Sequence, residues 1–99
     1  MQIAKVTGTV VSTNKSEKLM GLKLLVVQPL EIQTMAEKGG LAVAIDAVGA
    51  GEGEVVMIVG GSSSRQTALT DGKPVDMSIV AIIDNIDVKG KRVFQKYED

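Results

Sequence analysis

Apolar and polar residues alternate over residues 1–13, a spacing that predicts a first β-strand with one polar face. Val6 falls on its apolar face, and Gly8 predicts a bend or a close backbone approach in the same strand. Residues 19–28 predict a second strand. Pro29, which has no backbone N–H to donate, should lie at or just past the end of that strand.

Further runs of branched apolar residues predict three more strands. They cover residues 41–48, 54–59 and 75–88. The glycines of residues 49–53 are free to adopt positive φ, so this segment is expected to be the turn between the third and fourth strands. The polar segment 31–40 ends in two glycines and predicts an exposed loop.

Two shorter features complete the pattern. Residues 60–66 predict a turn that opens a single helical turn with a serine as its N-cap. Residues 89–91 predict a tight turn into residues 92–97, which would form a hairpin at the C-terminal end. Regular short strands with almost no helix indicate an all-β fold, a small barrel or a sandwich, and 99 residues suffice for one domain, 1–99.

Three predicted strands are apolar on both faces, which is more apolar surface than the core of one small barrel can use. They contain residues 24–27, 55–59 and 79–83. One explanation is that loops or a terminal hairpin cover the outer faces. The other, which we favour, is that neighbouring subunits bury them. Of Val27 and Val56, we expect one to face outward and the other to face the core.

Charge and composition exclude several classes of function. Eleven basic and twelve acidic residues give a net charge of −1, so no basic excess is present to hold nucleic acid or a membrane surface. Cysteine and histidine are absent, which removes thiol nucleophiles, thiolate metal sites and the commonest general base. We therefore expect a soluble intracellular protein that is not an enzyme and holds neither a cofactor nor a metal ion.

Individual motifs support this expectation. The glycines of residues 49–53 lack the third glycine of a dinucleotide fingerprint, because Glu54 stands there, and no helix is expected to follow, so a structural turn is favoured. Arg65 follows two glycines and three serines, where a capped turn is favoured over an anion site. Asp84 and Asp87 would fall on opposite faces of a strand and could not share a metal ion.

The first 88 residues resemble the bacterial microcompartment vertex protein family, the CcmL/EutN family of carboxysome and ethanolamine-utilisation shells. The segments that carry the resemblance follow one another over residues 1–88 and comprise 3–13, 21–30, 46–56, 61–65 and 74–84. The resemblance implies a five-stranded OB-like barrel that assembles as a homo-pentamer. It further implies a structural shell protein, located in the cytoplasm, whose partners are hexameric or trimeric shell tiles.

An alternative remains, because OB-like barrels also bind ligands or single-stranded nucleic acid. Such sites stack bases on aromatic side chains in a basic groove. The only aromatic residues of this chain are Phe94 and Tyr97, both near the C-terminal end, and the charge is balanced. The alternative is therefore disfavoured.

The resemblance also implies where contacts would lie. Candidate residues of the subunit interface or of loops at the five-fold axis are Asp46, Val48, Gly49, Gly51, Gly61, Ser62, Ser63 and Arg65. Candidate rim contacts to the tiles are Lys15, Lys18, Lys89 and Arg92, for each of which a merely solvated surface is the alternative.

Overall fold

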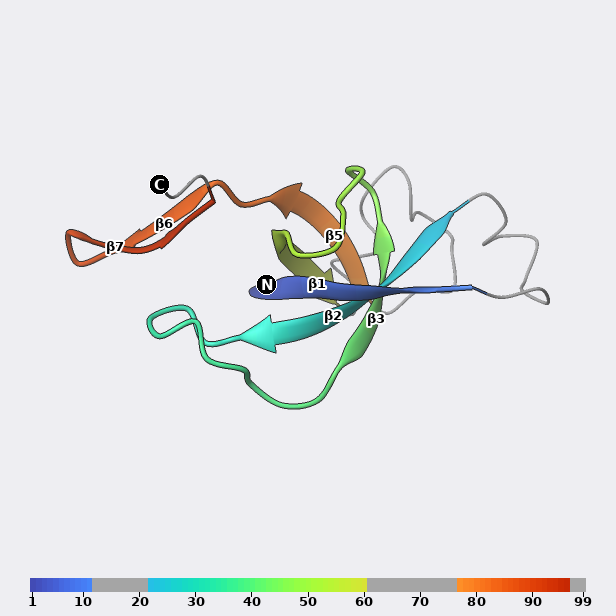
Figure 1. Ribbon diagram of the computed structural model, residues 1–99, viewed down its shortest axis with the longest axis horizontal. Coiled ribbons are helices and arrows are strands. Elements are labelled where there is room, and N and C mark those ends of the chain that lie inside the picture. Colours follow the sequence, from blue (N-terminus) through green and yellow to red (C-terminus); the bar gives the residue numbers. More distant parts are fainter. Residues whose placement is uncertain (12–21, 61–76, 97–99) are drawn as a thin grey trace.

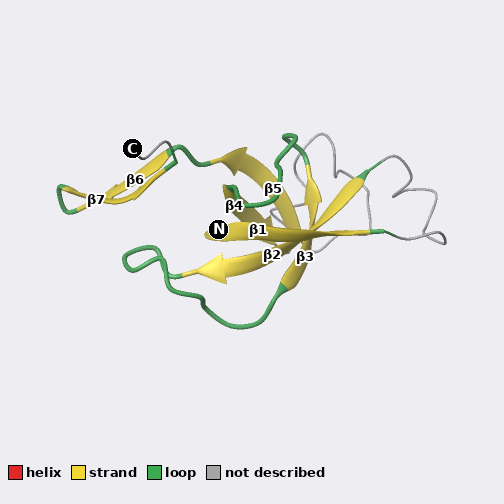
Figure 2. Cartoon of the chain, viewed as in Figure 1, coloured by secondary structure: helices red, strands yellow, loops and turns green. Residues whose placement is uncertain are grey.

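The computed structural model describes residues 1–11, 22–60 and 77–96, and in these ranges the chain forms seven β-strands and no helix (Figure 1; Figure 2). The strands are β1 (Gln2–Val10), β2 (Lys23–Leu30), β3 (Ala42–Asp46), β4 (Val55–Gly60), β5 (Met77–Ile82), β6 (Asn85–Val88) and β7 (Lys91–Gln95). The helical turn expected over residues 60–66 lies, beyond Gly60, outside the described residues.

Five of the strands close into a barrel in the order β1-β2-β3-β5-β4. The strand β1 closes it, because β1 pairs antiparallel with β2 on one side and with β4 on the other. Only β3 and β5 run parallel, and their pairing joins Ile45 to Ser78 and Asp46 to Ile79. The prediction of a small five-stranded β-barrel is therefore confirmed.

An irregularity in β1 sets which of its side chains face inward. The register between β1 and β2 shifts between Val6 and Gly8, as in a β-bulge, which confirms the predicted bend. A Cβ at Gly8 would lie 3.8 Å from Val26, an ordinary contact distance, so no close backbone approach requires the glycine. Pro29 lies inside β2 rather than at or past its end, because the strand continues to Leu30.

Small and branched side chains fill the interior of the barrel, as expected for a chain whose apolar residues are mostly valine, isoleucine, leucine and alanine. The core consists of Ala4, Val6, Leu25, Val27, Ala44, Ala50, Val56, Ile58 and Ile79. Val27 and Val56 are both fully buried in it. The expectation that one of these two residues faces outward is wrong, because both side chains face inward. Their neighbours Val26 and Met57 face outward instead.

A second apolar cluster lies on the outer surface of the barrel. Ile3, Leu30 and Val55 belong to the adjacent strands β1, β2 and β4 and are buried. Half-buried Met35 from the loop after β2 covers them, together with Ile83 after β5 and with Ile86 and Phe94 of the C-terminal hairpin. The chain itself therefore covers part of the outer apolar surface, as the first of the two explanations for the doubly apolar strands requires.

The fifth barrel strand is shorter than expected. The sequence predicts one strand over residues 75–88, whereas β5 stops just before Ile83, whose backbone N–H donates to the carbonyl of Val55 (2.8 Å). The chain bends at Asp84, whose carbonyl accepts the backbone N–H of Lys96 (2.7 Å). These two bonds turn the chain out of the barrel, so the prediction of a continuous strand is wrong.

The residues that follow form the expected C-terminal hairpin. β6 and β7 pair through a two-residue turn at Lys89 and Gly90, whose φ values of 52° and 79° suit the twist of an antiparallel pair. Ile86 pairs with Phe94, and both side chains pack on the outer cluster. In Figure 1 the hairpin extends from one end of the barrel as a separate two-stranded sheet.

We predict that Phe94→Ala releases the hairpin while the barrel stays folded. A two-stranded sheet is marginal in water by itself, and loss of a half-buried phenyl ring should cost about 1–2 kcal/mol. Hydrogen exchange should accelerate at the amides of β6 and β7 and stay unchanged in β2 and β4. Arg92→Ala, on the exposed side of the hairpin, is the matched control and should change little. Equal protection of the hairpin in both variants would contradict this role of Phe94.

Candidate assembly surface

The loop after β3 is held by the side chain that ends the strand. Asp46 is only 8% exposed, and its Oδ1 atom accepts the backbone N–H groups of Val48 (3.0 Å) and Gly49 (2.9 Å). Aspartate forms such local turns readily, and Gly49 supplies the positive φ of 80°. The arrangement leaves Val48 39% exposed on the outside of the loop.

The second half of the loop is hydrogen-bonded to β1 and to Glu54. The N–H of Gly51 donates to Oε1 of Glu54 (2.7 Å), and the N–H of Gly53 donates to the carbonyl of Val6 (2.8 Å). Val6 in turn donates its N–H to the carbonyl of Glu54 (2.9 Å). These backbone N–H groups are engaged within the chain and are not presented to a phosphate, which confirms that the glycine-rich segment is a structural turn.

Glu54 also connects the loop to the end of the hairpin. Its Oε2 atom lies 2.7 Å from Nζ of Lys96, and each side chain is 24% exposed. The hydrogen bond from Lys96 is the main cause that lowers the pKa of Glu54 below the ordinary value of 4.5, and the N–H of Gly51 adds to it. One ionised carboxylate therefore joins residues that are far apart in the sequence.

The candidate contact residues fall into separate regions. Asp46 ends β3, and Val48, Gly49 and Gly51 lie in the loop between β3 and β4. Lys89 and Arg92 lie on the hairpin instead, so the structure does not bring them to that loop. The remaining candidates lie outside the described residues, and these are Lys15, Lys18, Gly61, Ser62, Ser63 and Arg65.

Arg92 is engaged within its own hairpin. It forms an ion pair with Asp87, and its Nη1 atom donates to Oε1 of Gln95 (3.1 Å). Both partners of the ion pair remain about half exposed, at 48% and 52% of their side-chain surface. The hairpin therefore has one polar, exposed side and one side that packs on the barrel.

An exposed apolar surface follows the outer side of β2 and β3, and we call Val26, Leu41 and Val43 the β2–β3 patch. Val26 pairs directly with Val43 across the two strands. Val43 is 52% exposed and Leu41 63% exposed, whereas Ala44 beside them is buried. Leu41 and Val43 are not among the contact residues predicted from the sequence. The alternation of small inward and large outward residues over 42–44 is the signal that could have found them.

A second exposed apolar surface surrounds the start of β1, and we call it the N-terminal groove. It is lined by Met1, Gln2, Ile3, Leu30, Glu31, Ile32, Lys38 and Met57. Ile3 lies at its centre, because it pairs with Leu30 on one side and with Met57 on the other. Met1 is 86% exposed and Ile32 is 48% exposed, whereas Ile3 and Leu30 at the floor are buried, and polar Gln2, Glu31 and Lys38 complete the walls.

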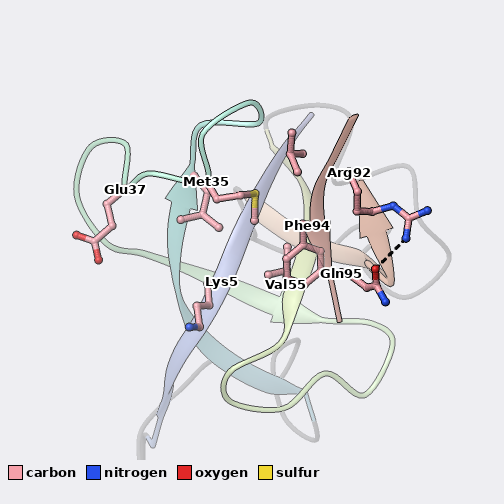
Figure 3. A pocket seen from close by; sticks show the side chains of 9 residues that line it. Lys5, Met35, Glu37, Val55, Arg92, Phe94 and Gln95 are labelled. Carbon is pink, nitrogen blue, oxygen red and sulfur yellow. Dashed lines mark hydrogen bonds between the residues drawn. The ribbon is translucent and has the colours of Figure 1, made fainter. Parts of the chain in front are cut away.

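A third hollow separates the hairpin from the barrel. Figure 3 shows Phe94 and Val55 together on its inner side, with Met35 above them, while Arg92 points away toward Gln95. Its lining joins an apolar floor to a few charged side chains. Within residues 1–11, 22–60 and 77–96, no three acidic side chains gather where they could hold a metal ion.

No helix in the described part of the chain is long and apolar enough to cross a membrane. The described surface thus offers a hydrogen-bonded loop and exposed apolar strand faces. Exposed apolar faces of this kind are common where one protein contacts another.

Comparison with known proteins agrees with this architecture. The profile of the family described as ethanolamine utilisation protein EutN/carboxysome matches residues 1–84. The shell vertex protein EutN of Salmonella typhimurium is 43% identical over 96 residues, which cover 97% of this chain and 96% of that protein. The solved structure of CcmL from Nostoc superposes with a TM-score of 0.90 at 45% identity, and the match covers 97% of this chain and all of that one.

A further relative is the pentameric microcompartment shell protein GrpN from Rhodospirillum rubrum. Its structure superposes with a TM-score of 0.80 at 43% identity and covers 89% of this chain and 99% of its own. A closed five-stranded barrel of this kind, matched over nearly its whole length, defines the class of small shell-protein barrels. The chain belongs to the EutN/CcmL family.

We predict that Glu54→Gln makes stability less sensitive to acid. Because the pKa of Glu54 is lowered in the folded protein, its ionised form stabilises the fold above about pH 4.5, and this contribution is lost as the pH falls through the lowered value. Melting temperatures from pH 7 to pH 3 should fall less steeply in the variant than in the wild type. Glu52→Gln removes a charge from an exposed position of the same loop and should keep the wild-type slope.

We predict that lysine at two consecutive positions of β2 has opposite consequences. Val27→Lys places an unpaired charge in the core, which costs several kcal/mol, and should unfold the barrel. Val26→Lys leaves the charge on the outer face, so the barrel should keep its circular dichroism spectrum but lose self-association in ultracentrifugation. An oligomer that survives Val26→Lys unchanged would show that this face is not in a contact.

Proposed function

We propose that this protein is a structural component of a bacterial microcompartment shell, in which five copies form a ring at each vertex. The observation that carries the proposal is 43% identity to a shell vertex protein over nearly the full length of both chains. The pentameric relative from Rhodospirillum rubrum supports the number five. The partners are then hexameric or trimeric shell tiles, and the protein's place is the shell, in the bacterial cytoplasm.

The geometry of shells gives such a ring its purpose. A flat layer of six-fold tiles cannot close into a polyhedron unless five-fold units occupy its vertices. A vertex protein is therefore needed in small amounts relative to the tiles, and only for closure. Its contact with each tile can be modest, since five repeats of one contact bind together far more tightly than one.

A structural role without catalysis agrees with the way the polar groups of the loop after β3 are used. The polar groups of the loop after β3 are used to hold the loop itself and to fasten it to β1. The alternative, a barrel that binds a ligand or single-stranded nucleic acid, has less support. Phe94 packs on the barrel's own outer cluster, and the net charge of −1 provides no attraction for a polyanion.

The proposal is tested by shell assembly with and without this chain. Co-expression with the cognate tiles should give closed, roughly icosahedral particles in electron microscopy, with this protein at the vertices. Without it, particles should be open or elongated and should leak a small reporter substrate. The variant Val27→Lys is a control for loss of the fold. Closed and impermeable particles in the absence of the chain would contradict the proposed function.

A further inference from the structure

We propose that the carboxylate of Glu54 couples the C-terminal hairpin to the loop after β3, so that release of the hairpin loosens the loop. This coupling lies within one chain and does not depend on the proposed ring. It concerns two groups of candidate contact residues that the fold keeps apart. Val48 and Gly49 lie in the loop, whereas Lys89 and Arg92 lie on the hairpin. A link between loop and hairpin joins these two regions energetically.

Glu54 divides its two carboxylate oxygens between the two regions. Its Oε1 atom accepts the N–H of Gly51 (2.7 Å), and its Oε2 atom lies 2.7 Å from Nζ of Lys96. The backbone N–H of Glu54 also donates to the carbonyl of Gly51 (3.2 Å), which closes the turn at the end of the loop. Both oxygens belong to one planar group, so a rotation that breaks one contact also moves the other oxygen. Movement of the hairpin is thus transmitted to the turn.

The hairpin can leave the barrel without unfolding it, because it forms its own two-stranded sheet and contributes no strand to the barrel. Its side chains Ile86 and Phe94, which pack on the outer cluster, are only half-buried. Beside Phe94, a hollow of about 670 Å³ lies between β7 and the barrel. Release of the hairpin is therefore a local opening that requires less free energy than unfolding of the barrel.

The hairpin is attached to two consecutive residues of the barrel. The carbonyl of Val55 accepts the backbone N–H of Ile83 (2.8 Å), where the chain leaves β5, and the side chain of Val55 belongs to the cluster under Phe94. Glu54, the preceding residue, holds the far end of the hairpin at Lys96. The hairpin therefore docks at the point where the loop joins β4, and its docking fixes the side chain of Glu54 there.

Coupling of this kind acts in both directions. A partner that binds only the ordered loop, at the 39% exposed Val48, favours the docked hairpin. A partner that holds the docked hairpin, at the half-exposed Arg92, orders the turn at Gly51. In the proposed shell, a contact made by one of the two regions then strengthens the contact made by the other.

Hydrogen exchange of single amides, followed by NMR, tests the coupling at Gly51. Phe94→Ala removes an apolar contact of the hairpin and leaves both partners of the ion pair in place. It should accelerate exchange of the Gly51 amide by about tenfold, the usual weight of a hydrogen bond to a charged group. Lys96→Met removes the charge that holds Oε2 and should have the same effect. The amides of Val48 and Gly49 donate to Asp46 instead, so their exchange should not change.

Further variants test whether the effect passes through Glu54. Glu54→Gln keeps an acceptor oxygen for Gly51 but loses the ion pair with Lys96. When Phe94→Ala is added to Glu54→Gln, exchange at Gly51 should therefore not rise further. Arg92→Ala, on the exposed side of the hairpin, is the matched control and should leave Gly51 at the wild-type rate.

Three results would overturn the coupling. The first is fast exchange in β6 and β7 of Phe94→Ala with unchanged exchange at Gly51. The second is an equal acceleration at Val48 and Gly49, which would show a general loosening of the loop. The third is an effect of Phe94→Ala that persists in the Glu54→Gln background. If Phe94→Ala does not fold, Lys96→Met decides, since unchanged exchange at Gly51 in that variant contradicts the link. The shell function is tested separately, by assembly, and stands or falls independently of these results.

Discussion

The double pairing of β1 is the constraint on which the rest of the structure depends. Because β1 bonds to β2 along one edge and to β4 along the other, the sheet closes into a barrel. Its inward residues Ala4 and Val6 join the core, and its outward residue Ile3 starts the second cluster. The loop after β3 is fastened to the same strand at Val6. The closure of the barrel, the packing of its core and the position of the loop after β3 thus all depend on β1.

Closure of so small a barrel leaves a surplus of apolar surface. The interior holds only one layer of side chains from each strand, so the outward residues of strands that are apolar on both faces must be covered elsewhere. The chain solves this in two ways. The hairpin and the loop after β2 cover Ile3, Leu30 and Val55, and the β2–β3 patch is left exposed. A surface of the second kind is what a shell protein needs for assembly.

Much of the fold could be predicted from the sequence, because it depends on local patterns. The strands follow from runs of branched residues, and the hairpin follows from a glycine turn at residues 89–91. The glycine-rich loop was also recognised as structural, from the missing third glycine of a phosphate-binding motif. Family resemblance added the barrel and the ring, neither of which follows from the spacing of apolar residues alone.

The orientation of individual side chains could not be predicted. Val27 and Val56 both face inward because they pair with the core residues Val6 and Ala4 of β1. The bulges lie in the partner strands, where the register skips Thr7 of β1 and Val80 of β5. A bulge reverses the alternation of faces, and its position depends on the partner strand. The end of β5 likewise depends on a bond between Ile83 and a residue of β4. Pairings between segments that are far apart in the chain cannot be predicted from the residues around each position.

The assembly surfaces were only partly foreseen for the same reason. The candidate loop at Asp46 was expected from family resemblance, and the structure shows how its residues are held. The exposure of Val43 and Ile32 became visible only when the barrel fixed their directions. The ion pair of Glu54 with Lys96 joins two polar residues whose spacing in the sequence carries no pattern.

The vertex function requires these barrels to associate through their outer faces into a closed ring of five. Native mass spectrometry of the wild-type protein at micromolar concentration tests it most directly. We expect a single dominant species of five 10.4 kDa chains, about 52 kDa. A dominant monomer of 10.4 kDa under the same conditions would contradict it.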